Sequence, residues 1–209
     1  MSGKRKYELK QRAAEMAETR RRITQAAVEL HGTVGPARTT VSAVADRAGV
    51  QRHTVYRHFP TEAELYGACS AHWLAANPLP DLAAWRAIRD PHERLARALE
   101  ELYIYYERAE PMLANVLRDL ELVPALGPTA VPFRDFMAEA TSALGAGWNT
   151  RGRRRRLLYA ALRHVLDFQS WRSLTADGLL ARADAVDLAS ELVEAAAVER
   201  RAARGRAGS

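Results

Sequence analysis

The sequence predicts an all-α protein, with a small three-helix N-terminal domain over residues 1–60 and a larger helical domain over residues 61–209. Apolar residues recur at three- and four-residue spacings in nearly every segment, and no segment alternates as a strand would. Stretches that contain glycine and proline separate these segments. Thr or Asp precedes several of them, which is typical of a helix N-cap.

The first helix is expected to run from Glu8 or Glu15 to Leu30, where "HGTVGPAR" ends it. One face of this helix carries the apolar residues Ile23, Ala26, Ala27 and Leu30.

Two short helices should follow, joined by "AGV". Thr39 or Thr40 can cap the first, "TVSAVADRA", and Gly49 is the residue best able to take a positive φ in the turn. The second should cover about Gln51 to Arg57. The residues of the first helix that should face inward are Val41, Val44 and Ala45.

Clear start signals mark the next two helices. Thr61 and Glu64 form a T-x-x-E capping box for a helix to about Ala76. After the loop "NPLPD", Asp90 caps a helix that has Pro91 at its first position. Its inward face should carry Leu95, Leu99, Leu102, Tyr103 and Tyr106.

Proline and glycine divide the rest of the chain. Pro111 is expected to open a new helix, "PMLANVLRDLELV", and "PALGPTAVP" to form a loop before a helix over 133–144. "GAGWNTRG" precedes a long helix from Arg153 to about Leu174, and "TADG" precedes a last one. The tail "RRAARGRAGS" is expected to fray. The last helical pattern comprises Val186, Ala189, Val193 and Ala196.

The charge is distributed unevenly. Of the formal net charge of +6, residues 1–60 carry +7 and residues 61–209 carry −1. A basic N-terminal region favours an anionic partner, nucleic acid first and a membrane surface second.

The cysteine content and the hydropathy pattern indicate the cellular compartment. Cys69 is the single cysteine, which excludes an intramolecular disulfide and fits the reducing cytoplasm. The charged N-terminus does not resemble a signal peptide, and no run of about 18 apolar residues predicts a membrane span. We therefore expect a cytoplasmic protein without a membrane partner.

The segment "GVQRHTVYRHF" combines many hydrogen-bond donors with few apolar side chains. In a helix-turn-helix the second helix enters the major groove, where its polar side chains meet base edges and phosphates. We expect Val55 alone to face the core. Arg52 and His53 should face base edges, and the hydroxyls of Thr54 and Tyr56 should face phosphates.

Residues 19–66 resemble the DNA-binding region of TetR-type transcriptional repressors. The matching segments are "ITQAAVEL", "TTVSAVADRAGV", "TVYRHF" and "FPTEAEL". "DFQSWRSLTADGLLARADAVDLASELV" resembles the C-terminal region of such proteins more weakly. The resemblance implies a homodimer that pairs through its last two long helices. It also implies a small-molecule effector whose binding in the larger domain weakens operator binding.

Carried over to this chain, the resemblance implies that Thr40 touches phosphate and that His58 lies near the DNA backbone. Gln51 stands where Ser or Thr is usual, so it is either a poor cap or a base reader. Glu62 stands where Lys often meets phosphate, and "KRKYELKQR" could replace that contact at the backbone or in the minor groove. The candidate DNA-binding residues are Thr40, Gln51, Arg52, His53, Thr54, Tyr56, Arg57 and His58.

Aromatic and polar residues of the larger domain could line an effector pocket, although the same residues would also suit an ordinary helical core. They are Tyr103, Tyr106, Phe133, Phe136, Met137, Trp148, His164, Phe168 and Trp171. The arginines of Arg151–Arg156 could face carboxylates across a dimer, an anionic ligand or solvent, and the last is favoured.

The function predicted is therefore a ligand-responsive homodimeric repressor released from a pseudo-palindromic operator. The alternatives are a helical ligand-binding protein without operator activity and an enzyme built on the larger domain. The histidines do not form a metal-binding pattern, and the sequence lacks a phosphate loop, a dinucleotide fingerprint and a serine elbow. We expect neither a cofactor nor catalysis.

Overall fold

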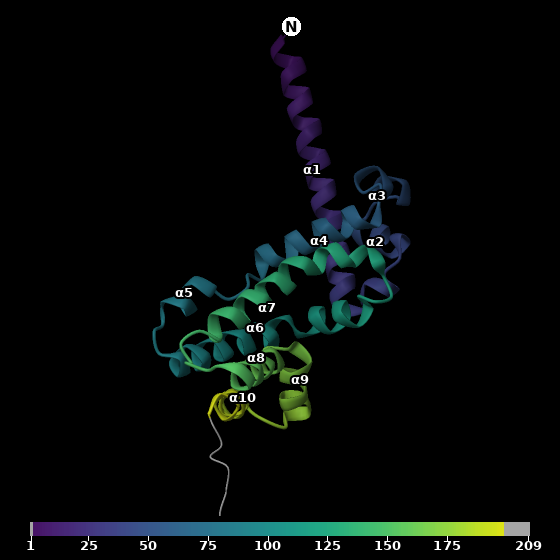
Figure 1. Cartoon of the computed structure of the whole chain (residues 1–209). Coiled ribbons are helices and arrows are strands. Elements are labelled where there is room, and N and C mark those ends of the chain that lie inside the picture. The colour runs from purple at the N-terminus through teal and green to yellow at the C-terminus, as the bar shows by residue number, and fades with distance from the viewer. Residues whose placement is uncertain (1, 199–209) are drawn as a thin grey trace, which may run out of the picture. The chain divides into compact units, whose positions relative to one another are not determined.

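The computed structural model describes residues 2–198, and within that range the regular structure is helical, without a strand (Figure 1). The chain divides into two compact units. The first comprises the residues up to Pro78 together with Ala109–Pro132. The second comprises Leu79–Arg108 together with the residues from Phe133 onward. Among the described residues, no helix is at once long enough and apolar enough to cross a bilayer.

The first unit contains the predicted three-helix arrangement. Its elements are α1 (Ser2–Thr33), the 3-10 turn η1 (Pro36–Arg38), α2 (Val41–Ala48), α3 (Arg52–His58), α4 (Glu62–Ala76), the end of α6 (Pro91–Asp119) and η2 (Pro124–Ala130). One apolar core holds α1 to α4 together. Its buried members are Ile23, Ala26, Ala27, Val44, Ala45, Ala48, Val55, Phe59, Leu65 and Cys69. The inward positions expected from sequence are therefore confirmed for Ile23, Ala26, Ala27, Val44 and Ala45, whereas Leu30 and Val41 are half-buried against this core.

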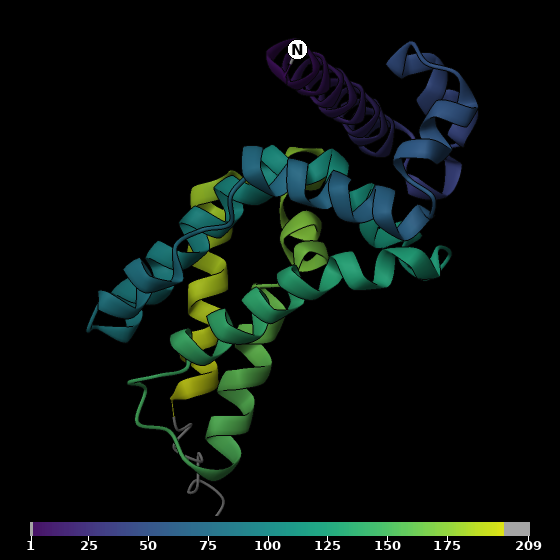
Figure 2. The ribbon, with the colours of Figure 1, turned by 90° about the horizontal axis from the view of Figure 1, so that it is seen from above.

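Helix α1 is longer than expected, because it begins at Ser2 rather than at Glu8 or Glu15 (Figure 2). All side chains from Lys6 to Glu18 are exposed. Apolar periodicity could not reveal these turns, since they bury nothing. Their Ala, Glu, Lys, Arg and Gln residues are nonetheless strong helix formers.

The second unit contains α5 (Leu82–Ala87), residues 91–108 of α6, most of α7 (Val131–Leu144), α8 (Gly152–Val165), α9 (Phe168–Thr175), the 3-10 turn η3 (Ala176–Gly178) and α10 (Arg182–Ala197). Helix α5 was not expected. Asp81 caps it by accepting a hydrogen bond of 2.8 Å from the Ala83 N–H, and Trp85 is fully buried.

Two expected helix boundaries are wrong. Helix α6 continues through Pro111 instead of ending there. Tyr106, Ala109, Met112 and Leu113 are buried on one continuous stripe, and this burial offsets the loss of a helical hydrogen bond at proline.

The expected long helix from Arg153 to Leu174 is two helices. It breaks after Val165, and Asp167 caps α9 by accepting hydrogen bonds from the N–H groups of Gln169 (2.9 Å) and Ser170 (3.2 Å). His164 therefore lies on α8, whereas Phe168 and Trp171 lie on α9.

Candidate nucleic-acid interface

The turn between α2 and α3 has the predicted geometry. Thr40 caps α2, its Oγ1 accepting a hydrogen bond of 3.1 Å from the Ala43 N–H. Gly49 ends α2 in the left-handed conformation, with φ 65° and ψ 41°. The N–H of Val50 then donates to the Ala45 carbonyl at 3.0 Å, which closes the turn and directs the chain into α3.

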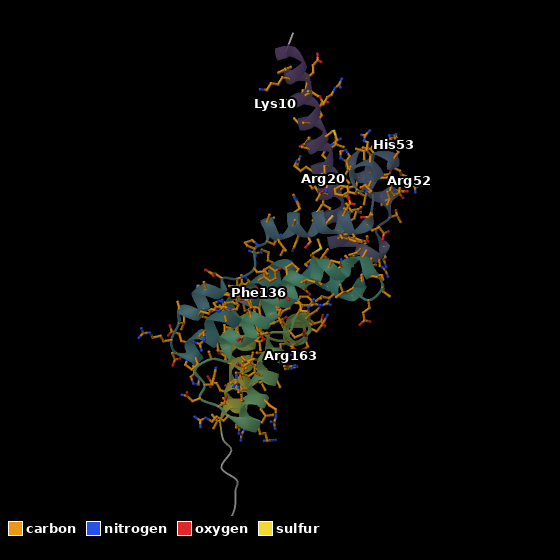
Figure 3. The ribbon with its side chains drawn as sticks, turned by 45° about the horizontal axis from the view of Figure 1, so that its top comes forward. Lys10, Arg20, Arg52, His53, Phe136 and Arg163 are labelled. Carbon is orange, nitrogen blue, oxygen red and sulfur yellow. The ribbon has the colours of Figure 1, made fainter. Side chains whose placement is uncertain are left out.

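Helix α3 presents most of its polar side chains to solvent. Gln51, Arg52, His53 and Arg57 are exposed, Tyr56 is 49% exposed and Thr54 is half-buried. Figure 3 shows Arg52 and His53 at the outer surface of α3. The sequence Arg52–His58 contains two arginines and no carboxylate. Its outer face therefore offers donors and positive charge without an acidic group to repel phosphate.

Gln51 occupies the N-cap position of α3 but its side chain makes no capping hydrogen bond. The residue is thus a poor cap, as one of the two sequence interpretations held, and its exposed amide remains available to a partner. Glu62 is exposed in the first turn of α4, where a carboxylate suits the helix N-terminus better than it suits DNA.

His58 is buried together with Val55, so the expectation that Val55 alone faces the core is wrong. His58 is 8% exposed, and its Nε2 has no hydrogen-bond partner within the described residues. Burial, then the charges of Arg57 and Arg20, lower its pKa, so the ring is neutral at pH 7. His58 therefore does not belong to the exposed surface of α3.

Arg20 of α1 holds the C-terminal end of α3, and sequence reasoning missed it. Its Nη1 donates a hydrogen bond to the His58 carbonyl, and its guanidinium lies 4.0 Å from the centroid of the Phe59 ring. A cation at the carbonyl end of a helix is favourable. The signal available in the sequence was one arginine of a run of three directly before the buried Ile23.

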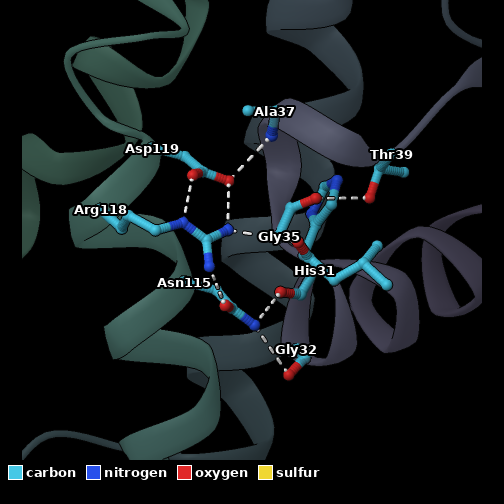
Figure 4. A network of polar contacts seen from close by, with 9 residues as sticks. His31, Gly32, Gly35, Ala37, Thr39, Asn115, Arg118 and Asp119 are labelled. Atoms are coloured by element: carbon cyan, nitrogen blue, oxygen red, sulfur yellow. Dashed lines mark hydrogen bonds and ion pairs between the residues drawn. The ribbon is translucent and has the colours of Figure 1, made fainter.

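A polar network fixes the segment between α1 and α2 against the end of α6 (Figure 4). The Asn115 amide donates to the carbonyls of His31 (3.1 Å) and Gly32 (3.0 Å). Arg118 donates to the Val34 carbonyl at 3.2 Å and pairs with Asp119. These bonds satisfy carbonyls at the C-terminal end of α1 and so hold the start of the helix-turn-helix.

Four of the candidate effector residues form a packed aromatic cluster in the second unit. The rings of Tyr106, Phe168 and Trp171 contact one another, with centroids 5.4–5.5 Å apart, and Tyr103 stacks on Tyr106 at 6.3 Å. The Tyr103 and Tyr106 hydroxyls donate to the carbonyls of Val165 (3.1 Å) and Leu166 (2.5 Å). These residues therefore build the core in this structure, and burial raises the pKa of both phenols.

The other candidate effector residues lie in different surroundings. Met137 accepts a weak 3.9 Å contact from the Tyr106 hydroxyl, and Phe133 is half-buried. Phe136 is buried against Trp85. Trp148 instead donates to the Leu144 carbonyl at 2.7 Å, and its ring lies 4.6 Å from that of His92. His164 is exposed, with its Nδ1 3.2 Å from the Ser170 hydroxyl.

Neither a metal site nor a reactive thiol is evident in the described part of the chain. It contains no group of three or more His, Cys, Asp or Glu side chains placed to hold a metal ion. Cys69 is buried, its thiol faces the Thr24 carbonyl at 3.8 Å, and burial raises its pKa to about 12. The thiol is thus packed and unreactive at neutral pH.

The similarity of this chain to known proteins includes the helix-turn-helix formed by α2 and α3. A family model described as bacterial regulatory proteins of the tetR family matches residues 23–69. The chain is 35% identical over 104 residues to the uncharacterised HTH-type transcriptional regulator TtgW of Pseudomonas putida, covering 44% of this chain and 78% of that protein. It is also 35% identical over 104 residues to the HTH-type transcriptional regulator SrpR of Pseudomonas putida.

The SrpR match covers 44% of this chain, which spans about half (49%) of SrpR. A solved structure from Mesorhizobium loti, described as a candidate TetR-family transcriptional regulator, has the same fold along most of the chain. The two superpose with a TM-score of 0.60 at 19% identity, over 87% of this chain and 96% of that one.

Proposed function

The chain belongs to the TetR family of DNA-binding transcriptional regulators, and from that premise we propose that it is a homodimeric repressor released from its operator by a small molecule. We further propose that it acts in the cytoplasm. The exposed, acid-free surface of α3 is the observation that carries the proposal. On it we assign base contacts to Arg52 and His53, with Gln51 as a third reader.

The remaining α3 contacts position the helix on the duplex. Thr54 and Tyr56 would donate hydroxyl hydrogen bonds to phosphates, and Arg57 would pair with one. Thr40 uses its Oγ1 lone pair as a cap acceptor, which leaves its hydroxyl hydrogen free to donate to a phosphate at the start of α2.

We assign the dimer interface to α8 and α10 because their exposed faces are complementary. Exposed basic residues of α8 include Arg153, Arg156 and Arg163, and exposed acidic residues of α10 are Asp184, Asp187 and Glu191. None of these six makes an ion pair within the described residues. Leu188 (39% exposed) and Leu192 (46% exposed) lie on the same face of α10 and supply an apolar centre. A two-fold axis would set α8 of each protomer against α10 of the other.

Sedimentation of matched leucine variants tests this interface. Leu192→Arg should convert the dimer to a monomer, because it buries a positive charge opposite the arginines of the partner's α8. Leu179→Arg is the control, since Leu179 is 69% exposed and lies outside α8 and α10. A dimer unaffected by Leu192→Arg would refute the assignment to α10.

We place the effector beside the aromatic cluster around Tyr106. The support is the Trp171 indole N–H, which is buried and has no acceptor among the described residues. Such a donor suits a polar group on an otherwise apolar ligand. The ligand would release the operator only if it binds more tightly to the conformation that cannot bind DNA than to the conformation that can. Mass spectrometry of small molecules released from the native dimer would identify it.

Selection from a random duplex pool tests the DNA-binding proposal. Two α3 helices related by a two-fold axis should select a pseudo-palindrome, with half-sites about 34–36 Å apart. A folded dimer that enriches no sequence would overturn the repressor proposal. Enrichment of a single, non-repeated half-site would overturn the dimeric mode of reading.

A further inference from the structure

The N-terminal turns of α1 form a helical overhang, residues 6–18, in which every side chain is exposed. At about 1.5 Å per residue the overhang extends roughly 20 Å. An unpacked helix of this length is marginal in water, so its conformation would be stabilised by a partner. Internal support is limited to contacts such as that from the Gln11 amide to Glu15 at 3.2 Å.

The charges of the overhang are divided between two sides of the helix. At about 100° per residue, the acidic residues Glu8, Glu15 and Glu18 fall on one side. Leu9, Ala13 and Met16 continue the stripe that, further along α1, carries Arg20 and the buried Ile23. Lys6 and Arg12 flank this stripe, and Lys10 lies one turn from Lys6. Acid is therefore absent from the side that continues the core-facing stripe.

Basic residues of this side are not committed to other contacts. Lys6, Lys10 and Arg12 make no ion pair within the described residues. By contrast, Arg21 at the base of the overhang is paired with Glu18 at 2.7 Å. Lys6 and Lys10 are one turn apart and lie away from the glutamates, whereas Arg12 lies one turn from both Glu8 and Glu15. The two unpaired, exposed lysines suit a polyanion rather than an internal partner.

The overhang belongs to the same compact unit as α3 and leaves it beside that helix (Figures 1 and 3). Lys10, Arg52 and His53 lie at the same end of the unit in Figure 3. Arg20, at the junction, holds the C-terminal end of α3. A duplex bound along α3 would thus bring its flanking phosphates toward the overhang.

We propose that the basic side of the overhang binds the phosphate backbone of DNA flanking the half-site that α3 reads. The inference rests on the proposed operator binding and extends it to a second, sequence-independent contact. Lys6 and Lys10 bind phosphate, while the small side chain of Ala13 lets the helix approach the backbone. The footprint on each side is therefore longer than the half-site, and the extra binding depends on salt.

Duplex length is the variable that tests this contact. The selected operator is prepared as a core duplex and with about 10 extra base pairs on each side, and scrambled duplexes of both lengths serve as references. Binding is measured by fluorescence anisotropy from about 0.05 to 0.2 M salt. The wild-type protein should bind the flanked operator about tenfold or more tightly than the core operator.

A pair of matched double variants separates local contact from net charge. Lys6→Gln/Lys10→Gln should reduce the preference for flanked DNA to less than about twofold. It should also make the slope of log K against log salt concentration less negative, by up to about 1.8 per protomer if both lysines contact phosphate. Arg89→Gln/Arg134→Gln removes two exposed charges from the second unit and should leave the preference unchanged.

The possible outcomes separate the two proposals. Equal binding of core and flanked operators by the wild-type protein would overturn the overhang contact. So would an equal effect of the Arg89/Arg134 control, which would indicate net charge alone. Failure to distinguish core operator from scrambled core would overturn the proposed function instead. Protection of residues 6–18 from amide hydrogen exchange on flanked DNA alone would support the contact.

Discussion

The Asp119 carboxylate accepts a hydrogen bond of 2.9 Å from the backbone N–H of Ala37, which lies 82 residues earlier in the chain. Asp119 is 1% exposed and also pairs with Arg118. The bond joins the end of α6 to η1, directly before the helix-turn-helix. This buried carboxylate therefore adds a long-range polar contact to the apolar core and to the Asn115 and Arg118 bonds that position α2 and α3 within the first unit.

Removing that carboxylate should destabilise the first unit. Asp119→Ala leaves the Ala37 N–H and the Arg118 guanidinium without their partner, which we expect to cost about 1–3 kcal/mol. Asp135→Ala, at an exposed aspartate of α7, should change the free energy of unfolding by less than about 0.5 kcal/mol. Urea unfolding of both variants measures the difference. Equal stabilities would show that the Asp119 contacts contribute nothing.

Gly35 should not tolerate alanine. Its φ of 93° and ψ of 158° belong to a region that essentially only glycine occupies, and a Cβ would overlap Arg118 and Asp119. We expect Gly35→Ala to cost about 2 kcal/mol or more. Gly67→Ala is the matched control, because Gly67 lies inside α4 with open space around it. That change should stabilise the protein by up to about 1 kcal/mol. Thermal unfolding that ranks the two variants the other way would contradict the packing described.

His31 should make the protein less stable in mild acid. Burial lowers its pKa to about 4, against a smaller opposing effect of Asp119, and its ring lies 5.4 Å from that of Tyr66. The folded protein therefore holds His31 neutral, whereas the unfolded chain binds a proton below about pH 6.5. This contribution to stability is complete above about pH 6.5 and is lost as the pH falls toward about 4.

Between pH 7 and pH 5 the loss attributable to His31 should be about 2 kcal/mol. Denaturant unfolding at both pH values, compared between the wild-type protein and His31→Leu, isolates it from other titrating groups. The variant should lose about 2 kcal/mol less than the wild-type protein. An equal loss in both proteins would show that His31 is not held neutral by the fold.

Arg52 and Tyr56 should contribute to DNA binding in different ways. Arg52→Ala should weaken binding to the operator by about 1–3 kcal/mol, because a base contact is lost. It should weaken binding to scrambled DNA less. Tyr56→Phe should weaken both DNAs to a similar extent and leave the salt dependence nearly unchanged, since it removes no charge. A uniform loss on both DNAs for Arg52→Ala would reassign Arg52 to phosphate. Anisotropy titrations at fixed salt make the comparison.

The helix-turn-helix could be predicted because its signals are local. Thr40 as cap, Gly49 in the turn and the Thr61 side chain accepting from the Glu64 N–H at 3.2 Å each act within a few residues. Such signals do not depend on what the rest of the chain does.

The features that could not be predicted depend on tertiary contacts or on signals that compete. Burial overrides the helix-breaking tendency of Pro111, and the Asp167 cap interrupts an apolar pattern that reads as continuous. His58 is buried within α3, and Arg20 holds the end of that helix from 38 residues away. Sequence spacing within α3 cannot reveal either contact.

The central proposal is that α3 reads a specific DNA sequence as part of a dimer. Its most direct test is the ratio of affinities for the selected pseudo-palindrome and a scrambled duplex of equal length, at one stated salt concentration. We predict a ratio of about 10³ or more, with two protomers bound per duplex. Equal affinity for the two duplexes, with a folded dimer in hand, would contradict the proposal.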